Sequence, residues 1–417
     1  LSGAFEGCTG LEAVTLSDGL TEIDERAFAG CTALQALQLP GSLTSIGDSA
    51  FQGCTGLISV EHTGTRSERL KMGIYAFAGC TSLKEFSYPE YSTAVVASAF
   101  SGCTALERVT LADTITGIQR SAFKGCTSLR EIVLPDGLTY IYASAFENCS
   151  SLREIAIPGG ITQLPEYVFS GCAALERVDL EDGLTRIDGH AFAGCESLTQ
   201  ITLPDTVTTL GTGIFSGSGV TLVDFPAGMT MLPGSTFENC TSLESITLPD
   251  GLTAIGAQAF LGCTSLNHVV IPDSVTSIGG EAFALCTALT AIDLPEGPTT
   301  LATGLFNAAG LVSLEIPESV TSIGYTVFAS CPNLTELTIL PSVTSIQTSA
   351  FQGCTPANIT IRCVSGSYAH AFAEEYGFQV SLLGEEQTRQ ARAAVYAPDG
   401  SAVETGFTVA WYEENGT

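Results

Sequence analysis

The segment SIGDSAFQGCTGL (45–57) returns in nearly the same form as RIDGHAFAGCESL (186–198) and SIGGEAFALCTAL (277–289). Aligning the chain on the phenylalanine of this phrase gives sixteen units, from Phe5 to Phe351. Twelve of the fifteen spacings between successive phenylalanines are 23 residues, one is 26 and two are 22. A fixed period of this length is typical of proteins in which supersecondary units stack in a row. We therefore expect one elongated array instead of the two or three globular domains that 417 residues would ordinarily form.

Each unit reads roughly C-T-x-L-x-x-I-x-L-P-x-x-L-T-x-I-x-x-x-A-F-x-G. In LREIVLP (129–135), apolar and polar side chains alternate, which predicts a short strand with Ile132 and Leu134 directed inward. A PDG turn follows, and LTYI (138–141) predicts a second short extended piece. ASAFENC (143–149) is too short for a stable helix, so we expect one helical or 3₁₀ turn. Stacked units then form a parallel sheet over one continuous core.

The unit resembles the leucine-rich repeat of the BspA type, found on surface proteins of bacteria that live in animal hosts. The resemblance covers residues 1 to about 380, and GSYAHAFAEEYGFQV (366–380) resembles that family's closing helical cap. It implies a leucine-rich repeat solenoid of about 16 repeats of 23 residues, with stacked parallel β-strands, short second strands and 3₁₀ or helical turns. The general leucine-rich pattern has an Asn or Cys ladder just after the strand, whereas the small-residue column here follows the phenylalanine. We expect the solenoid at 1–357, a C-terminal capping segment at 358–383, and a linker with a partial β module or tail at 384–417.

Fourteen of the fifteen cysteines occupy the slot three residues after the phenylalanine, and Cys363 is the remaining one. An odd total cannot pair completely, and Cβ atoms stacked about 4.8 Å apart are wider than the roughly 3.8 Å of a disulfide. Zinc needs ligands that converge on one point, which a straight column does not provide. Two units have Ser218 or Ala309 in this slot, each followed by a link one residue shorter. The pattern favours buried free thiols that pack as small apolar groups, over disulfides and over metal or redox chemistry.

Acidic residues outnumber basic ones by 44 to 15, for a formal net charge of -29. Such a charge repels phosphate backbones and anionic lipid headgroups, so we expect neither nucleic acid nor a membrane surface as partner. The sequence lacks an apolar run long enough to span a bilayer, which predicts no membrane insertion. Because the chain opens inside a repeat, at LSGAFEGC (1–8), we expect its natural amino terminus to lie outside this sequence. The family resemblance implies an extracellular location on a bacterial cell surface, with signal and anchor outside this sequence, and we expect a monomer.

Catalytic motifs are missing from the sequence. It contains no H-E-x-x-H, no G-x-S-x-G and no phosphate-binding glycine loop. None of the four histidines has a partner at metal-ligand spacing (His62, His190, His268 and His370). Acidic turn residues recur at one edge of the stack, but small residues interrupt the column, which favours a solvated edge over a calcium site. We expect no enzymatic activity, no cofactor and no metal.

Function in a solenoid usually resides on its extended sheet surface. The outward strand positions carry small hydroxyl and methyl side chains and no aromatic residue, which disfavours sugar stacking and tight hot spots. Opposite charges on adjacent strands can pair. Two interpretations stay open, a broad platform for a protein or glycan and a solubilising face without a partner. The candidate binding residues are Glu85, Arg108, Glu131, Glu154, Arg177, Asp179, Asp224 and His268.

Two segments depart from the repeat. The link EHTGTRSERLKMGIYAF (61–77) is three residues longer and concentrates Arg66, Arg69 and Lys71, so it is either a loop that docks an acidic partner or a tolerated insertion. The tail AAVYAPDGSAVETGFTVAWYEENGT (393–417) alternates like strands, which predicts the start of a β-sandwich module or a tail that packs on the solenoid.

These observations and the resemblance lead to one functional hypothesis and two rivals. The first is a non-enzymatic bacterial surface protein that binds host or microbial macromolecules by adhesion or protein–protein contact along its solenoid face. The second is a spacer or targeting module of a larger secreted enzyme. The third is a cytosolic scaffold.

Overall fold

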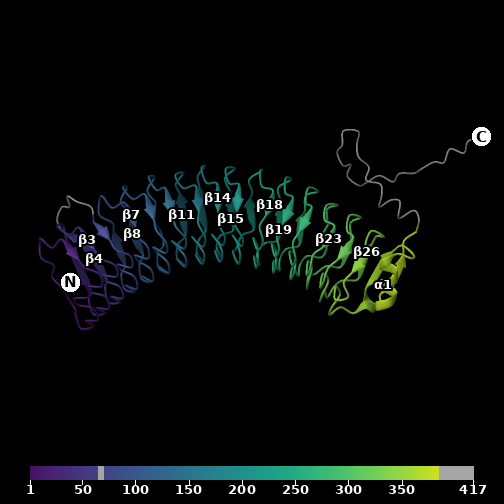
Figure 1. Ribbon diagram of the computed structural model, residues 1–417, viewed down its shortest axis with the longest axis horizontal. Helices are drawn as coiled ribbons and strands as arrows, with labels where there is room; N and C mark the ends of the chain where they lie inside the picture. Colours follow the sequence, from purple (N-terminus) through teal and green to yellow (C-terminus); the bar gives the residue numbers. More distant parts are fainter. Residues whose placement is uncertain (64–69, 385–417) are drawn as a thin grey trace, which may run out of the picture.

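The computed structural model describes residues 1–63 and 70–384. The chain forms a bow-shaped solenoid that advances coil by coil from one end of the arc to the other (Figure 1). Most coils contain a long strand, a turn, a two-residue short strand and a broad second turn, and strands of successive coils pair in parallel. The predicted solenoid of 23-residue repeats with parallel strands and short second strands is therefore confirmed.

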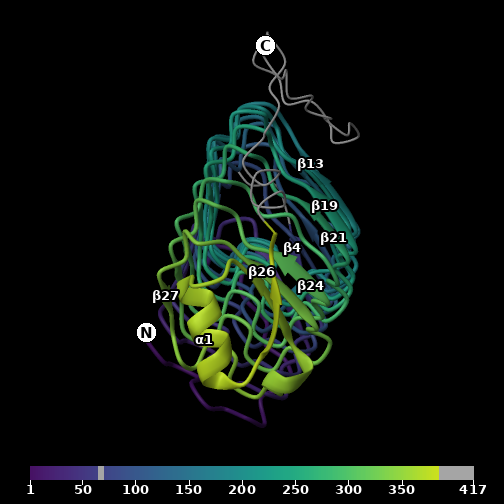
Figure 2. The same cartoon turned by 90° about the vertical axis from the view of Figure 1, so that its right-hand side faces the viewer.

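Long and short strands lie on opposite sides of the solenoid, as the end view shows with β13 and β19 on one side and β27 on the other (Figure 2). The long strands are β2 (Ala36–Pro40), β4 (Ser59–Thr63), β6 (Glu85–Ser87), β8 (Arg108–Thr110), β11 (Glu154–Ile157), β13 (Arg177–Leu180), β15 (Gln200–Thr202), β17 (Leu222–Asp224), β19 (Ser245–Thr247), β21 (His268–Val270), β24 (Ser313–Glu315), β26 (Glu336–Ile339), β28 (Thr360–Cys363) and β29 (Gln379–Leu382). The surface formed by their outward side chains is called the long-strand face below.

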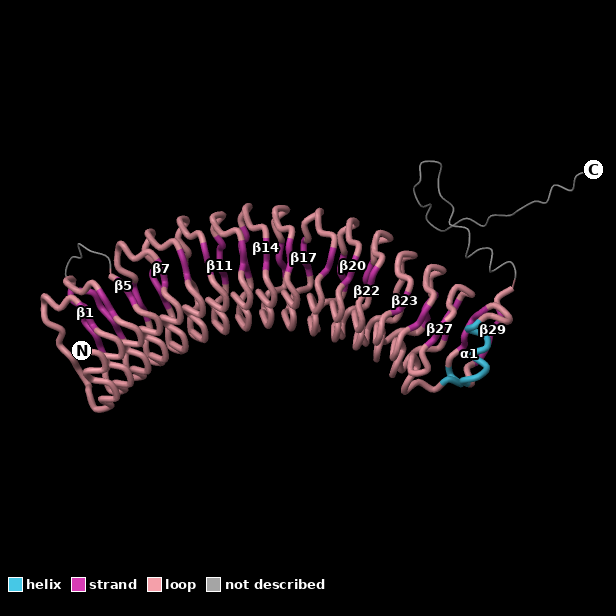
Figure 3. The backbone as a smooth tube through the Cα atoms, viewed as in Figure 1, coloured by secondary structure: helices cyan, strands magenta, loops and turns pink. Residues whose placement is uncertain are grey.

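The short strands are β1 (Glu22–Ile23), β3 (Ser45–Ile46), β5 (Lys71–Met72), β7 (Ala94–Val95), β9 (Gly117–Ile118), β10 (Tyr140–Ile141), β12 (Gln163–Leu164), β14 (Arg186–Ile187), β16 (Thr209–Leu210), β18 (Met231–Leu232), β20 (Ala254–Ile255), β22 (Ser277–Ile278), β23 (Thr300–Leu301), β25 (Ser322–Ile323) and β27 (Ser345–Ile346). Turns from long to short strands line the convex edge of the arc, and the phenylalanine turns line the concave edge (Figure 3).

The coil with residues 129–135 corrects one prediction. Its side chains alternate as expected, with Ile132 and Leu134 buried and Val133 exposed. Only an isolated bridge between Glu131 and Arg108 is present there, however, so no strand forms. The coil lies slightly away from the preceding one, since the backbone hydrogen bond from Arg130 N to Glu107 O is 3.5 Å long, at the upper limit for such a bond.

The phenylalanine turns are not helical, which corrects the prediction of a helical or 3₁₀ turn at 143–149. Ser144 and Asn148 adopt left-handed φ values of 60° and 61°, and a right-handed helix cannot pass through such residues. The same two slots, two residues before and two after each phenylalanine, are left-handed along most of the array. Glycine fills the second slot in most coils because it has no Cβ penalty there.

Leu285 occupies this second slot with a left-handed φ of 61°, and its side chain is 46% exposed. A left-handed conformation costs a non-glycine residue about 1–2 kcal/mol, and glycine loses about 0.5–1 kcal/mol in backbone entropy. Leu285→Gly is therefore expected to raise the free energy of unfolding by about 0.5–1 kcal/mol. Urea unfolding followed by circular dichroism checks this, and a lower midpoint would contradict the assignment of strain.

The core is built on a column of sixteen phenylalanine rings. Fifteen consecutive stacked pairs join Phe5 to Phe351, with centroids 5.1 to 6.1 Å apart. Stacking at this separation is offset, the arrangement that ring quadrupoles favour. A backbone ladder accompanies it, because each phenylalanine N–H donates to the next coil, as Phe123 N does to Ala145 O at 2.8 Å.

The cysteine column lies beside this ladder. All fifteen cysteines are free, and most of their side chains are buried. In each interior coil with cysteine, the thiol donates to the carbonyl oxygen of the preceding coil's phenylalanine, as Cys149 Sγ does to Phe123 O at 3.2 Å. Burial raises the pKa of the Cys103 and Cys172 thiols to about 12 and that of Cys126 well above its usual value. Small, protonated thiols packed between coils agree with the sequence interpretation.

Hydroxyl ladders, which the sequence analysis did not identify, add to the stacking. In many coils the threonine of the L-T-x-I phrase donates to the carbonyl oxygen of its counterpart in the preceding coil, for example Thr139 Oγ1 to Thr116 O at 3.1 Å. Thr116 donates in turn to Thr93 O at 3.2 Å. The hydroxyl is a second donor to a carbonyl that already accepts the backbone N–H of the same threonine, as Thr116 O does from Thr139 N at 2.9 Å.

The far end of the stack contains a single 3₁₀ turn, η1 (Pro356–Asn358), and the helix α1 (Tyr368–Tyr376). The Ser367 side chain caps α1 by accepting from His370 N, and Gly377 ends the helix at a left-handed φ of 77°. Phe372 and Phe378 pack against Phe351, the last ring of the column. The helix covers the open end of the core. The module or tail predicted at 393–417 lies outside the described residues.

Candidate functional site

All eight predicted binding-face residues are exposed. Seven lie on the long-strand face, and Glu131 occupies the equivalent position of the coil that has only an isolated bridge. Glu85 aligns with Arg108 in the parallel register, and Glu154 aligns with Arg177. Arg108 lies 3.8 Å from Glu131 on the next coil, and both side chains are about two-thirds exposed. This exposed ion pair contributes about 0–1 kcal/mol to stability.

The three remaining predicted residues, Asp179, Asp224 and His268, do not gather with these residues around one point. Asp179 pairs with Arg177 of its own strand at 2.6 Å. Asp224 accepts a hydrogen bond from Thr202 Oγ1 at 3.0 Å, and His268 aligns with Ser245. The eight residues thus spread along the face and do not form one compact site.

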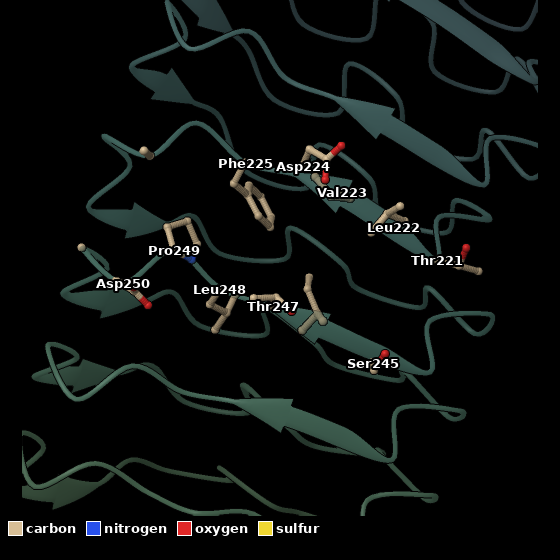
Figure 4. Close-up of a pocket in the computed structure, with 13 residues that line it drawn as sticks. Thr221, Leu222, Val223, Asp224, Phe225, Ser245, Thr247, Leu248, Pro249 and Asp250 are labelled. Atoms are coloured by element: carbon tan, nitrogen blue, oxygen red, sulfur yellow. The ribbon is translucent and has the colours of Figure 1, made fainter. Parts of the chain in front are cut away.

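A pocket of about 470 Å³ lies on this face between β17 and β19 and is called the groove below (Figure 4). Leu222, Phe225, Leu248 and Pro249 supply apolar walls. The full lining is Thr221, Leu222, Val223, Asp224, Phe225, Ala227, Ser245, Ile246, Thr247, Leu248, Pro249, Asp250 and Gly251.

The groove opens where the long-strand sheet is interrupted. β17 pairs with β15 and β19 pairs with β21, but no ladder joins β17 to β19 within the described residues. Phe225 occupies the slot that holds Leu203 and Leu248 in the adjacent coils, and its ring meets Phe237 edge-on at 6.2 Å. Phe225 thus places a ring at this interruption, in a slot that leucine fills in both adjacent coils.

Sequence reasoning missed Phe225, because it searched only the outward strand positions for aromatic residues. Phe225 is in an inward slot, yet its side chain is only partly buried. The available signal was phenylalanine in place of the leucine that usually precedes the turn proline, within one of the two shortened units. The phenylalanine in the leucine slot and the shortened unit both lie at the groove.

A smaller pocket of about 200 Å³ lies where the coil of residues 131–135 diverges from β8. Arg108, Glu131 and Val133 line it. Arg108 and Glu131 pair across the gap, and Asp113 also lines this pocket, so its lining carries both signs of charge.

Charge divides the solenoid into two parts. Between Arg186 and Arg362 the sequence has no Lys or Arg and fourteen Asp or Glu residues. The earlier long-strand face is mixed, because Lys84, Arg108 and Arg177 alternate there with carboxylates. The groove lies in the uniformly acidic part.

The predicted loop cluster is only partly described. Lys71 begins β5, where its backbone N–H donates to Thr44 O at 2.9 Å and its side chain is exposed. Arg66 and Arg69 lie outside the described residues. Their proposed role with an acidic partner stays a prediction.

The described part of the chain contains neither a metal-binding cluster nor a membrane-spanning helix. Among residues 1–63 and 70–384, no group of three or more His, Cys, Asp or Glu side chains gathers around a point that could hold a metal ion. In this part of the chain, no helix has the length and apolar character needed to cross a bilayer.

Comparisons with known proteins agree with this architecture. A family model described as BspA type leucine rich repeat region matches residues 2–68, 65–176, 162–284 and 253–377. A leucine-rich repeat protein from Bacteroides ovatus is 27% identical, with 89% of this chain and 91% of that chain covered and a TM-score of 0.64. A leucine rich cell surface protein from Faecalibacterium prausnitzii is 28% identical over 87% of this chain and 88% of that chain, with a TM-score of 0.46. No curated protein matches the chain.

Proposed function

Because the chain belongs to the BspA-type leucine-rich repeat family, we propose that it is a non-enzymatic bacterial cell-surface protein that binds host or microbial macromolecules through its long-strand face. The observation that carries the proposal is the groove between β17 and β19, a concave apolar feature on an otherwise low-relief polar face. Exposed apolar concavities rimmed by polar groups are typical of interaction sites.

The side chains on this face suit binding better than catalysis. The thiols are protonated and mostly buried, which makes them poor nucleophiles. The carboxylates beside the groove, Asp224 and Asp250, are accompanied by hydroxyl and apolar groups. Binding of a macromolecule needs only a broad contact surface with a few anchoring side chains, and these residues provide both.

A spacer or targeting role is the second candidate, favoured by the regular coils outside the groove. Hydroxyl, thiol and aromatic columns run along the array, and long stretches of the face carry small side chains. Such regularity is sufficient for a rod that holds another domain at a distance.

Binding to an array of host matrix proteins and glycans tests the proposal. We expect at least one component to bind, and the variant Leu222→Lys, at a groove residue that is 54% exposed, to weaken it about tenfold or more, as for loss of an interface anchor. The control Met231→Lys places the same charge at a 55% exposed position of β18 on the opposite side. Absence of binding to every component, or equal effects of the two variants, would favour the spacer.

A further inference from the structure

We propose that the groove between β17 and β19 receives a Lys or Arg side chain from a basic segment of a partner protein. The inference rests on the proposed function and specifies the partner's chemistry. It draws on the apolar walls of the groove, on two carboxylates at its rim and on the charge of the surrounding coils.

The walls suit the long stem of a basic side chain. Leu222 is 54% exposed at one side, and Leu248 with Pro249 forms the other. In Figure 4 the Phe225 ring lies between these two sides. Lys and Arg bury their methylene stems against apolar surface while keeping the charge in water, and an aromatic ring attracts a cation directly.

Carboxylates are placed for the charged head. Asp224 and Asp250 line the groove from neighbouring coils. One Asp224 oxygen is held by Thr202 Oγ1 at 3.0 Å, which orients the carboxylate and leaves its other oxygen available. Neither aspartate forms an ion pair within the described residues. A cation in the groove would therefore find unneutralised acceptors.

The long-range field favours the same class of partner. Fourteen carboxylates and no Lys or Arg occupy residues 187–361, so this part of the solenoid attracts cations and repels anions. The smaller pocket also has apolar walls and carboxylates, Asp113 and Glu131, but Arg108 lines it and would repel a partner's cation. The lining of the larger groove combines apolar walls with two carboxylates and contains no basic residue.

Fluorescence anisotropy with the labelled heptapeptide GLKLRLG as probe, and GLQLQLG as its neutral counterpart, tests the inference on the full chain. We expect the basic peptide to bind, and D224N/D250N to weaken it about tenfold, since close charge pairs dominate such contacts. The control is D205N/D273N, which removes the same charge from the turn positions equivalent to Asp250 on the two flanking coils, outside the groove lining. This control is expected to change affinity less than about twofold, because neither carboxylate lines the groove and an exposed charge without direct contact contributes little.

A second variant, Phe225→Leu, restores the leucine found in adjacent coils and removes the aromatic wall of the groove. We expect about fivefold weaker peptide binding with an unchanged circular dichroism spectrum, because leucine already fills this slot in the adjacent coils. The inference is overturned if the basic peptide does not bind, or if the neutral peptide binds equally well. It is also overturned if the two double aspartate variants lose equal affinity for the basic peptide, or if Phe225→Leu binds that peptide as the wild type does. An array partner that binds normally to D224N/D250N would overturn it while leaving the proposed function intact.

Discussion

Phe169→Ala is expected to lower the free energy of unfolding by about 3–5 kcal/mol, the range for removing a fully buried phenylalanine. The Phe169 side chain is completely buried, and its ring stacks on Phe146 at 5.6 Å and on Phe192 at 5.8 Å. Its removal leaves a cavity that neighbouring coils cannot fill, because hydrogen-bonded ladders fix the spacing between them.

Urea unfolding followed by far-ultraviolet circular dichroism measures the loss. Phe5→Ala is the matched control, since Phe5 occupies the same slot in the first coil but is 44% exposed and stacks only on Phe28. We expect the control to lose less than about 1 kcal/mol, in proportion to the smaller area it buries. Similar losses for the two variants would mean that the ring column does not carry the core.

Cys149→Leu is expected to lower the free energy of unfolding by about 1–3 kcal/mol through overpacking. The Cys149 side chain is fully buried, and its thiol lies against the carbonyl oxygen of Phe123 at 3.2 Å. A leucine there adds carbon atoms in a slot closed by the adjacent coils. It also removes the thiol donor from that carbonyl.

Cys149→Ala separates these effects, because alanine fits the slot but cannot donate. Ala309 occupies the equivalent position naturally. We therefore expect Cys149→Ala to lower the free energy of unfolding by no more than about 1 kcal/mol, the contribution of one weak hydrogen bond and a small loss of side-chain volume. Thermal unfolding of both variants beside the wild type measures the difference. A larger loss for alanine than for leucine would show that the thiol itself, and not its size, is required.

The fold could be predicted from the sequence because each coil repeats the same pattern of apolar, polar and turn residues. Alternation of apolar and polar residues predicted which strand side chains are buried, including Ile132 and Leu134 in a coil that forms no regular strand. The turns were harder to predict. Left-handed residues such as Ser144 and Asn148 carry no strong compositional signal when glycine is absent, so the turn was assigned a helical geometry that it lacks.

The candidate site was only partly accessible from the sequence. Exposure of Asp224 and His268 follows from strand periodicity, but the groove depends on how far adjacent coils separate. That separation differs from one pair of coils to the next, and periodicity does not describe it. The ladders of Thr116 and Thr139 were likewise hidden, because they join a side chain to a backbone atom of another coil.

The central claim is that equivalent slots superimpose from coil to coil, so that the sulfur column is structural packing. Counting thiols with a chromogenic disulfide reagent, without reductant, tests it most directly. In denaturant we predict all fifteen thiols to react, and in the native protein we predict prompt reaction of the exposed Cys8, with the buried thiols protected. Fewer than half of the thiols reacting in denaturant, or buried cysteines reacting as fast as Cys8 in the native protein, would contradict the account.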